Sequence, residues 1–318
     1  MTLLLAIDGG GTRTRCIAVD RDGGIRGTGE AGPSNHLHVP MDAATAALRG
    51  ATGAALAASG AAPGSVALVS AGLAGVDADG TGAEEGAGML RSIGFDRVAV
   101  HGDMVIAHHG ALAGEPGVMA LAGTGSSVLG IGVDGTVIKA GGWGPLYGDG
   151  GSAYQLGRLG LVAAAEAYDE SGPMTSLVAR LTTALGVAAF PDTVTRLYSD
   201  LSGQQHVASL ATVVDACAEE GDEVAAGICR QAGIDLARSV AAVIRRLPLR
   251  KKLVSYQGAV LRRSRLVRAA FVDALGTHWI EVEVRPPRLE PIFGAVLLGA
   301  RAAGWRMPLQ SMEMRHGV

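Results

Sequence analysis

The sequence predicts an α/β protein made of two related halves, each opening on the same strand–loop–hairpin unit. In the first half, an apolar strand at 3–7 stops at Asp8 and gives way to three glycines. The β-rich segment and turn that follow, up to residue 27, indicate a hairpin rather than a helix. The same order of strand, glycine and threonine loop, and hairpin returns at 118–139. A length of 318 residues fits roughly two domains.

After its hairpin, the first half alternates between helix and strand. Apolar periodicity predicts these elements in order: a helix at 41–59, a strand at 66–70, a helix at 82–93, a strand at 98–102 and a helix at 104–112. Glycines and a proline at 114–117 then break the pattern. We therefore place a first domain at 1–115, on which a C-terminal helix near 303–318 could pack, and a second domain at 116–302.

The second half carries a long helical segment inside its α/β pattern. The chain from 156 to 247 is almost entirely helical by period, and a strand at 252–256, a second strand at 282–284 and a helix from Pro291 follow. Glycine, proline and aspartate predict the breaks in the helical segment, at 171–173, 190–192, 202–203 and 220–222. We expect this segment to be a helical insertion.

Composition excludes several classes of function. The chain has 27 lysines and arginines against 30 aspartates and glutamates, so no basic surplus indicates nucleic acid. No apolar run is long enough for a membrane helix, and the apolar N-terminus is too short for a signal peptide. The three cysteines lack CxxC or metal-ligand spacing, which fits a reducing compartment. We expect a cytoplasmic protein without a nucleic-acid or membrane partner.

The two glycine loops, at 8–14 and 122–127, are candidate phosphate sites. Glycines let backbone N–H groups approach an anion closely, and Asp8 suits a hydrated divalent cation. No G-x-x-x-x-G-K-[ST] motif occurs, and the G-x-G-x-x-G at 27–32 opens no helix because Pro33 follows. Two loops facing one another would clamp a polyphosphate. The alternative for a single loop is a sharp turn with no ligand.

Several polar and aromatic residues have two interpretations from sequence alone. Asp103 ends a strand, where it could act as a general base or simply cap the next helix. Asn35 could bind a sugar or form an Asx-turn, and Trp143 could meet a sugar face or pack in the core. Asp149 could bind sugar hydroxyls or cap a helix at 154–167. Gly258 could lie against a ligand or form a turn.

An ordered set of motifs resembles the actin/hexokinase/Hsp70 ATPase superfamily. Within that superfamily the chain is similar to the N-acetylglucosamine kinase group, which shares its fold with the BadF/BadG/BcrA/BcrD ATPase family. The matching stretches span nearly the whole chain, at 8–14, 33–36, 102–103, 122–127, 141–144, 147–153, 220–222, 257–260, 291 and 294–300. The resemblance implies two ribonuclease H-like (actin-like ATPase) lobes around a central nucleotide cleft.

The resemblance also implies an activity. It indicates ATP-dependent phosphorylation of the 6-hydroxyl of an amino sugar, N-acetylglucosamine or glucosamine, by a homodimer that uses Mg²⁺. Ala74 stands where acetamido-sugar kinases can carry a serine, so a broad-specificity hexokinase is an alternative. A BadF-type activator of a reductase or dehydratase is another, but it needs cysteines for an iron–sulfur cluster. Cys16, Cys217 and Cys229 show no such pattern.

The same resemblance assigns roles to individual residues. Asp103 becomes the catalytic base and Asp8 the Mg²⁺ residue. The nucleotide-binding residues are Gly10, Gly11, Thr12, Arg13, Gly123, Thr124, Gly258 and Ala259. The sugar-binding residues are Ser34, Asn35, His36, Gly125, Ser126, Ser127, Trp143 and Asp149. The segment 216–233 corresponds to the helix pair that flanks adenine.

Overall fold

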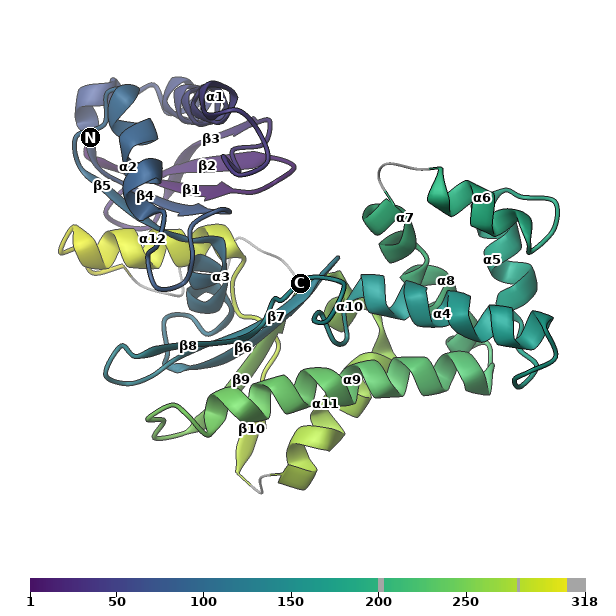
Figure 1. Cartoon of the computed structure of the whole chain (residues 1–318). Helices are drawn as coiled ribbons and strands as arrows, with labels where there is room; N and C mark the ends of the chain where they lie inside the picture. The colour runs from purple at the N-terminus through teal and green to yellow at the C-terminus, as the bar shows by residue number, and fades with distance from the viewer. Residues whose placement is uncertain (200–202, 279–280, 308–318) are drawn as a thin grey trace. The chain divides into compact units, whose positions relative to one another are not determined.

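The computed structural model describes residues 1–199, 203–278 and 281–307, and its contacts divide the chain into two compact units (Figure 1). Unit 1 comprises Met1–Pro116 and Pro286–Val318, and unit 2 comprises Gly117–Arg285. The final helix groups with unit 1, whereas the sequence assigned residues up to 302 to the second domain. Of the helix expected near 303–318, residues 303–307 form a turn and irregular chain, and 308–318 lie outside the described residues.

Unit 1 is built on a five-stranded mixed sheet in the order β3-β2-β1-β4-β5. Its strands are β1 (Leu3–Gly9), β2 (Thr14–Val19), β3 (Ile25–Ala31), β4 (Val66–Leu73) and β5 (Val98–Gly102). The first three strands form an antiparallel meander, and β4 and β5 run parallel to β1. The carboxyl ends of β1, β4 and β5 therefore meet at one edge of the sheet.

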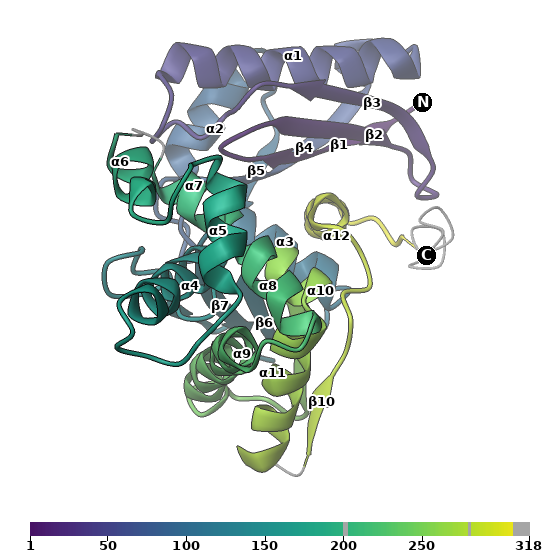
Figure 2. The same ribbon diagram turned by 90° about the vertical axis from the view of Figure 1, so that its right-hand side faces the viewer.

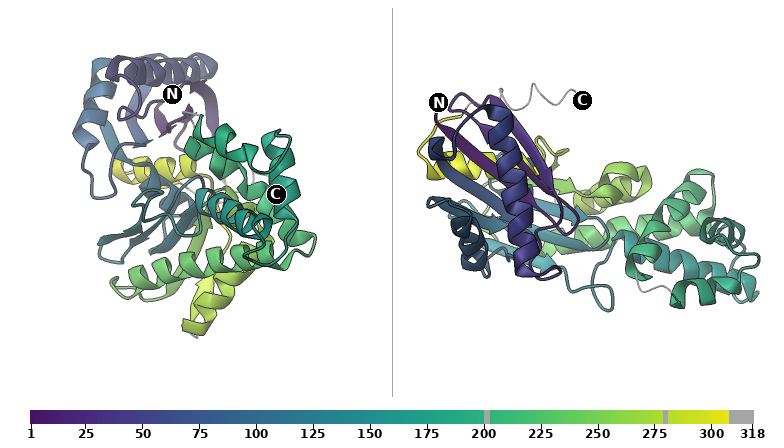
Figure 3. Two further views of the ribbon diagram at one scale, coloured as in Figure 1. Left: turned by 45° about the vertical axis from the view of Figure 1, so that its right-hand side comes forward. Right: turned by 90° about the horizontal axis from the view of Figure 1, so that it is seen from above.

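Helices cover both faces of this sheet (Figures 2 and 3). They are α1 (Met41–Ser59), α2 (Ala83–Ser92), α3 (Asp103–Ala111) and α12 (Pro291–Ala302), with a short 3₁₀ turn at Pro63–Ser65. Alternate side chains of β1 point to opposite faces, so Leu3 and Leu5 pack with α1 and α2 while Leu4 and Ala6 pack with α12. Burial on both faces explains why the first strand is continuously apolar.

Two glycine patterns are explained by helix packing. A side chain at Gly27 or Gly29 of β3 would clash with the backbone of α1, so the G-x-G-x-x-G stretch is a packing feature and not a dinucleotide site. In α12, a side chain at Gly294 would clash with the Ile106 carbonyl oxygen of α3. The small residues of α12 thus allow close helix–helix contact within unit 1.

Unit 2 repeats the strand topology of unit 1, in the order β10-β9-β6-β7-β8. Its strands are β6 (Gly117–Ala122), β7 (Ser126–Ile131), β8 (Val137–Gly141), β9 (Lys252–Gln257) and β10 (Val282–Val284). Strands β6 to β8 form the meander, and β9 and β10 run parallel to β6. The prediction of two related halves with an α/β fold is confirmed.

The helical insertion of unit 2 lies between β8 and β9, as expected. The helices of the unit are α4 (Ala153–Tyr168), α5 (Leu177–Leu185), α6 (Asp192–Tyr198), α7 (Gly203–Ser209), α8 (Ala211–Glu219), α9 (Glu223–Ile244), α10 (Ala259–Arg263) and α11 (Arg265–His278). Helix α9 packs on β6, β7 and β8, and α11 packs on α9. Within the described ranges, every helix is too short or too polar to traverse a bilayer.

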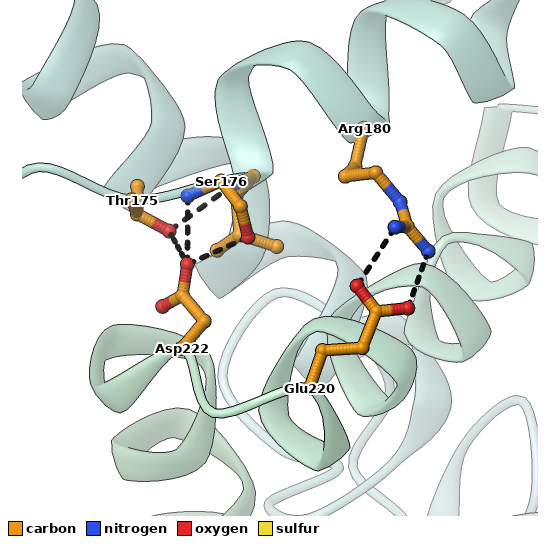
Figure 4. A network of polar contacts seen from close by, with 6 residues as sticks. Thr175, Ser176, Arg180, Glu220 and Asp222 are labelled. Carbon is orange, nitrogen blue, oxygen red and sulfur yellow. Dashed lines mark hydrogen bonds and ion pairs between the residues drawn. The ribbon is translucent and has the colours of Figure 1, made fainter.

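The turn between α8 and α9 is fixed by a polar network (Figure 4). The Asp222 carboxylate caps α9 by accepting the Ala225 N–H at 3.0 Å. It also accepts the Thr175 and Ser176 hydroxyls and the Ser176 N–H, each at 2.7 Å. One side chain therefore joins the start of α9 to the segment that precedes α5.

Candidate active site

The first glycine loop connects β1 to β2 and is open to solvent at its tip. The Gly10 N–H donates to the Arg13 carbonyl at 2.9 Å, which closes a tight turn with Thr12 exposed. A Cβ at Gly11 would meet no atom within 4 Å. Packing therefore does not require glycine there, and the open backbone suits the approach of an anion.

The base of this loop is tied to the segment that carries the predicted sugar residues. The Thr14 hydroxyl donates to the Gly32 carbonyl at 2.8 Å, and the Ser34 N–H donates to the Gly10 carbonyl at 3.1 Å. A side chain at Gly9 would clash with the Ser34 hydroxyl. The loop and the 32–36 segment thus form one structural element of unit 1.

Asp8 lies in a group of charged side chains at the end of β1. Burial is the main cause that raises its pKa above the ordinary value; Asp103 and Glu290 raise it further, while Arg15 and Arg13 oppose the shift. Arg15 is itself paired with Glu290 at 2.8 Å. A buried carboxylate beside other acids fits a hydrated cation. In the described ranges no three His, Cys, Asp or Glu side chains could ligate a metal directly.

Asp103 follows the carboxyl end of β5, on the sheet edge where β1 ends at Gly9, the residue after Asp8. It is the first residue of α3, and its carboxylate accepts the Met104 N–H at 2.7 Å. Gly102 occupies the capping position, so capping does not account for Asp103. Ligands of α/β proteins bind outside the carboxyl ends of parallel strands, which makes this edge the candidate reaction site of unit 1.

The segment after β3 holds two buried polar atoms that lack a partner in the described structure. These are the Ser34 hydroxyl, on a fully buried residue, and Nδ1 of His36. Asn35 does form the predicted Asx-turn, since its side-chain oxygen accepts the Leu37 N–H at 3.1 Å. Native proteins rarely leave buried polar atoms unpaired, so Ser34 and His36 are the stronger candidates for ligand contact.

The second glycine loop, between β6 and β7, lies at the beginning of α4. The Ala153 N–H donates to the Gly123 carbonyl at 2.9 Å, and the Tyr154 N–H donates to the Thr124 carbonyl at 3.1 Å. The Ser126 hydroxyl donates to the Gly150 carbonyl at 2.8 Å. Ser127 makes a longer hydrogen bond of 3.4 Å with the Ala140 carbonyl. Both predicted sugar-binding serines therefore also stabilise the backbone around the loop.

Asp149 and Trp143 occupy the glycine-rich segment that follows β8. Asp149 is only 6% exposed and has a left-handed φ of 59°, which is rare for a residue other than glycine. A Cβ at Gly125 would lie 2.8 Å from its Oδ2, so Gly125 is needed to accommodate the carboxylate. Ser152 caps α4, which leaves Asp149 without the capping role. Trp143 is 68% exposed and is not a core residue.

A cavity of about 270 Å³ adjoins the second glycine loop inside unit 2. Gly123, Thr124 and Ala259, three of the residues expected at the nucleotide, line it. The remaining lining residues come mainly from four helices and are Ala153, Leu156, Gln205, Ala208, Ser209, Ala211, Thr212, Asp215, Val260, Arg263 and Ser264. The described lining is thus small and largely apolar, and it includes two charged side chains, Asp215 and Arg263.

Two parts of the expected nucleotide site do not line this cavity. Gly258 does not line it, and a side chain at Gly258 would clash with the Ala122 backbone, so packing explains this glycine. No residue of α9 lines the cavity either, although the resemblance placed the segment 216–233 beside adenine. The wall is formed instead by Ala211, Thr212 and Asp215 of α8. The one available signal was an acid, Asp215, inside an apolar helical run.

Comparison with known proteins identifies the family. The model of the BadF/BadG/BcrA/BcrD ATPase family matches residues 5–299. The chain belongs to this family. An N-acetyl-D-glucosamine kinase of Dictyostelium discoideum is 28% identical over 93% of this chain and 97% of the relative. An N-acetylmuramic acid/N-acetylglucosamine kinase of Clostridium acetobutylicum is 29% identical over 66% of this chain and 70% of the relative.

Solved structures of sugar kinases share the fold. A candidate N-acetylglucosamine kinase of Chromobacterium violaceum superposes with a TM-score of 0.76 at 25% identity, covering 94% of this chain and 99% of that one. A ROK family glucokinase of Streptomyces griseus superposes with a TM-score of 0.55 at 17% identity, over 94% and 99%. The expected match to the actin-like ATPase fold is confirmed.

Proposed function

We propose that this family member is an ATP-dependent sugar kinase that phosphorylates the 6-hydroxyl of an amino sugar, N-acetylglucosamine or glucosamine. The observation that carries the proposal is the pairing of Asp103 and Asp8 at one sheet edge of unit 1. Each follows or ends a parallel strand, and the open glycine loop begins beside Asp8. The names of the two kinase relatives support the amino-sugar substrate.

Asp103 accepts the proton of the acceptor hydroxyl in this proposal. Phosphoryl transfer to an alcohol needs a group that positions the attacking oxygen and takes its proton. The N-terminus of α3 favours the ionised carboxylate, because a helix N-terminus carries partial positive charge. The Met104 N–H fixes one carboxylate oxygen of Asp103.

Asp8 would hold a hydrated Mg²⁺, and each glycine loop would contact phosphate. When bound, Mg²⁺ neutralises charge on the transferred phosphoryl group. Gly10, Gly11 and Thr12 offer the backbone and hydroxyl of one loop, and Gly123 and Thr124 offer those of the other. The cavity beside Thr124 takes the nucleoside, since its small, largely apolar wall suits a purine.

The proposal assigns the sugar contacts to four side chains. Ser34 and His36 contribute the buried atoms without partners. Asp149 contributes a carboxylate that can accept two hydroxyl hydrogen bonds, and Trp143 an exposed ring for a sugar face. A broad-specificity hexokinase would use the same groups, and only a substrate panel separates the two.

The activator alternative needs accessible cysteines, and the structure disfavours it. All three cysteines are buried with free thiols. Burial raises the pKa of the Cys16 and Cys229 thiols, which opposes thiolate ligation. The proposal also includes a cytoplasmic homodimer, for which light scattering after size-exclusion chromatography gives the direct measurement of mass.

The test is sugar-dependent release of ADP from ATP. N-acetylglucosamine or glucosamine should stimulate release well above other hexoses, and Mg²⁺ should be required. Asp103→Asn should lower kcat by roughly 10²–10⁴-fold, with a sugar KM close to wild type. Asp96→Asn is the matched control, because this exposed acid precedes β5 whereas Asp103 follows it. If Asp103→Asn turns over normally, Asp103 is not the catalytic base. If no sugar changes the rate of ADP release, the protein is not a sugar kinase.

A further inference from the structure

We infer that Asp215 and Arg263 bind the purine base of the phosphate donor and select it. In this assignment the Asp215 carboxylate accepts a hydrogen bond from the 6-amino group of adenine, and the Arg263 guanidinium stacks on the ring. The inference rests on the proposed function, because it takes the cavity of unit 2 as the nucleoside site. It adds two specificity residues that the glycine motifs did not indicate.

The described part of the cavity wall suits a flat aromatic ligand. Leu156, Ala208, Ala211 and Val260 supply aliphatic surface. Among the described lining residues, none is aromatic, and Arg263 alone has a planar, delocalised side chain. Guanidinium groups stack on aromatic faces. A purine in this cavity would therefore take Arg263 as its stacking partner.

Asp215 and Arg263 line the same cavity without pairing with each other. Among the described residues, no ion pair joins them, and Oδ1 of Asp215 is buried with no hydrogen-bond partner. A buried acceptor without a donor is destabilising, and a donor on a ligand would relieve it. Rotation about the last torsion of aspartate is broad, so either oxygen can be presented to the cavity. Within the part of the chain that the structure describes, Asp215 and Arg263 therefore offer a ligand two opposite charges that are not paired with each other.

Helix periodicity places each charge beside the apolar wall that would hold the base. Ala211 and Asp215 are four residues apart on α8, so they share one helix face. Ala259 and Arg263 are likewise four apart on α10. A nucleoside carries hydrogen-bond donors on its base and on its ribose. The 6-amino group lies in the plane of the base, and the wall suits a flat group better than the non-planar ribose. We therefore assign the 6-amino group, and not a ribose hydroxyl, as the donor to Asp215.

The experiment measures binding of four ligands by calorimetry in the absence of sugar. The ligands are ATP, purine riboside triphosphate, which lacks the 6-amino group, 2′-deoxy-ATP, which lacks one ribose hydroxyl, and tripolyphosphate, which lacks the nucleoside. The proteins are wild type, Asp215→Ala, Asp215→Asn, Arg263→Lys and the control Glu219→Ala. Glu219 is exposed one turn further along α8 and does not line the cavity.

Wild type should bind ATP about tenfold more tightly than purine riboside triphosphate. This ratio corresponds to a difference in binding free energy of ~1.4 kcal/mol. Asp215→Ala should bind both nucleotides alike. Asp215→Asn, whose amide oxygen still accepts a hydrogen bond, should keep part of the preference. Arg263→Lys should weaken both nucleotides by a similar factor and leave tripolyphosphate unchanged. Glu219→Ala should match wild type throughout.

Three results would overturn the inference. Wild type could bind the two nucleotides equally, or Asp215→Ala could keep the full preference for ATP. A preference for ATP over 2′-deoxy-ATP that Asp215→Ala abolishes would assign Asp215 to the ribose instead. Failure of the proposed function is distinguishable, because binding is measured without transfer. If the protein prefers ATP to purine riboside triphosphate but phosphorylates no sugar, the proposed function is refuted and the inference about Asp215 and Arg263 still holds.

Discussion

Replacement of Asp222 by alanine should destabilise the helical part of unit 2. The carboxylate is the N-cap of α9 and accepts four hydrogen bonds, three of them from Thr175 and Ser176 (Figure 4). These hydrogen bonds hold its pKa at about 2, below the ordinary value of 3.8, against the opposing effect of burial. Removing the side chain leaves the start of α9 and the segment before α5 without their common acceptor.

The expected loss of unfolding free energy is ~1–2 kcal/mol. A helix N-cap contributes about 1 kcal/mol. Without solvent screening, a pKa lowered from 3.8 to about 2 would correspond to roughly 2.4 kcal/mol of unfolding free energy. Because Asp222 is half-exposed, solvent screening reduces that figure. For a chain of this size, the loss should lower Tm by roughly 2–8 °C.

Thermal and urea unfolding of the variants provides the measurement, with Glu220→Ala as control. Glu220 lies two residues away and pairs with Arg180 at 2.8 and 3.1 Å on the surface, where such a pair contributes about 0.5 kcal/mol. Asp222→Asn keeps one oxygen that can accept the Ala225 N–H, but its amide nitrogen cannot accept the three hydrogen bonds made at Oδ2. Its Tm should therefore lie between those of wild type and Asp222→Ala. A Tm of Asp222→Ala within 1 °C of wild type, or no lower than that of Glu220→Ala, would refute the reasoning.

The effect of Asp222 should also depend on pH in one direction. Its pKa is lower in the folded protein than in the unfolded chain. The stabilisation is therefore complete above the ordinary aspartate pKa, and it is lost as pH falls toward about 2. The difference in urea midpoint between wild type and Asp222→Ala should be constant from pH 7 to about 5 and shrink between about pH 4 and 2. A difference that grows on acidification would contradict this sign.

Three further predictions concern the rest of the chain. Asp8→Asn should raise Tm, because burial raises the pKa of Asp8 and makes the ionised form unfavourable, yet it should abolish stabilisation by Mg·ATP in the same melts. Gly294→Val should cost about 3 kcal/mol or more by forcing α12 from α3, whereas Gly53→Ala, in open space on α1, should be neutral or stabilising by up to about 1 kcal/mol. All three cysteines should resist a thiol reagent until the protein is unfolded, because burial raises the pKa of Cys16 and holds that of Cys229 at about 12.

Much of the fold could be predicted because the local signals were strong. The helix at Met41–Ser59 has its predicted bounds, since Pro40 precedes it and Gly60 ends it with a left-handed φ of 65°. The strand Val282–Val284 also has its predicted bounds. The break at Leu210 between α7 and α8 was missed, because no glycine or proline marks it. Turns without such residues leave little trace in a sequence.

The candidate site was predictable to the level of its loops but not of its atoms. The glycine loops, Asp8 and Asp103 were found because each follows or ends a strand with a clear apolar pattern. Which of Asp149 and Ser152 caps α4 could not be decided, since both residue types favour that position. The charged lining residue Asp215 was missed, because a single acid in an apolar helix has no motif.

The sequence by itself determined the repeated strand–loop–hairpin units and the α/β class, because strand and helix periods are local properties of the chain. Only the tertiary structure decided that α12 packs with unit 1. It established that the Ser34 hydroxyl and Oδ1 of Asp215 are buried without a hydrogen-bond partner among the described residues. It also decided which glycines are required by packing, as at Gly258, and which face open space, as at Gly11. Burial, steric contact and hydrogen-bond partners depend on residues far apart in the chain, so no local pattern contains them.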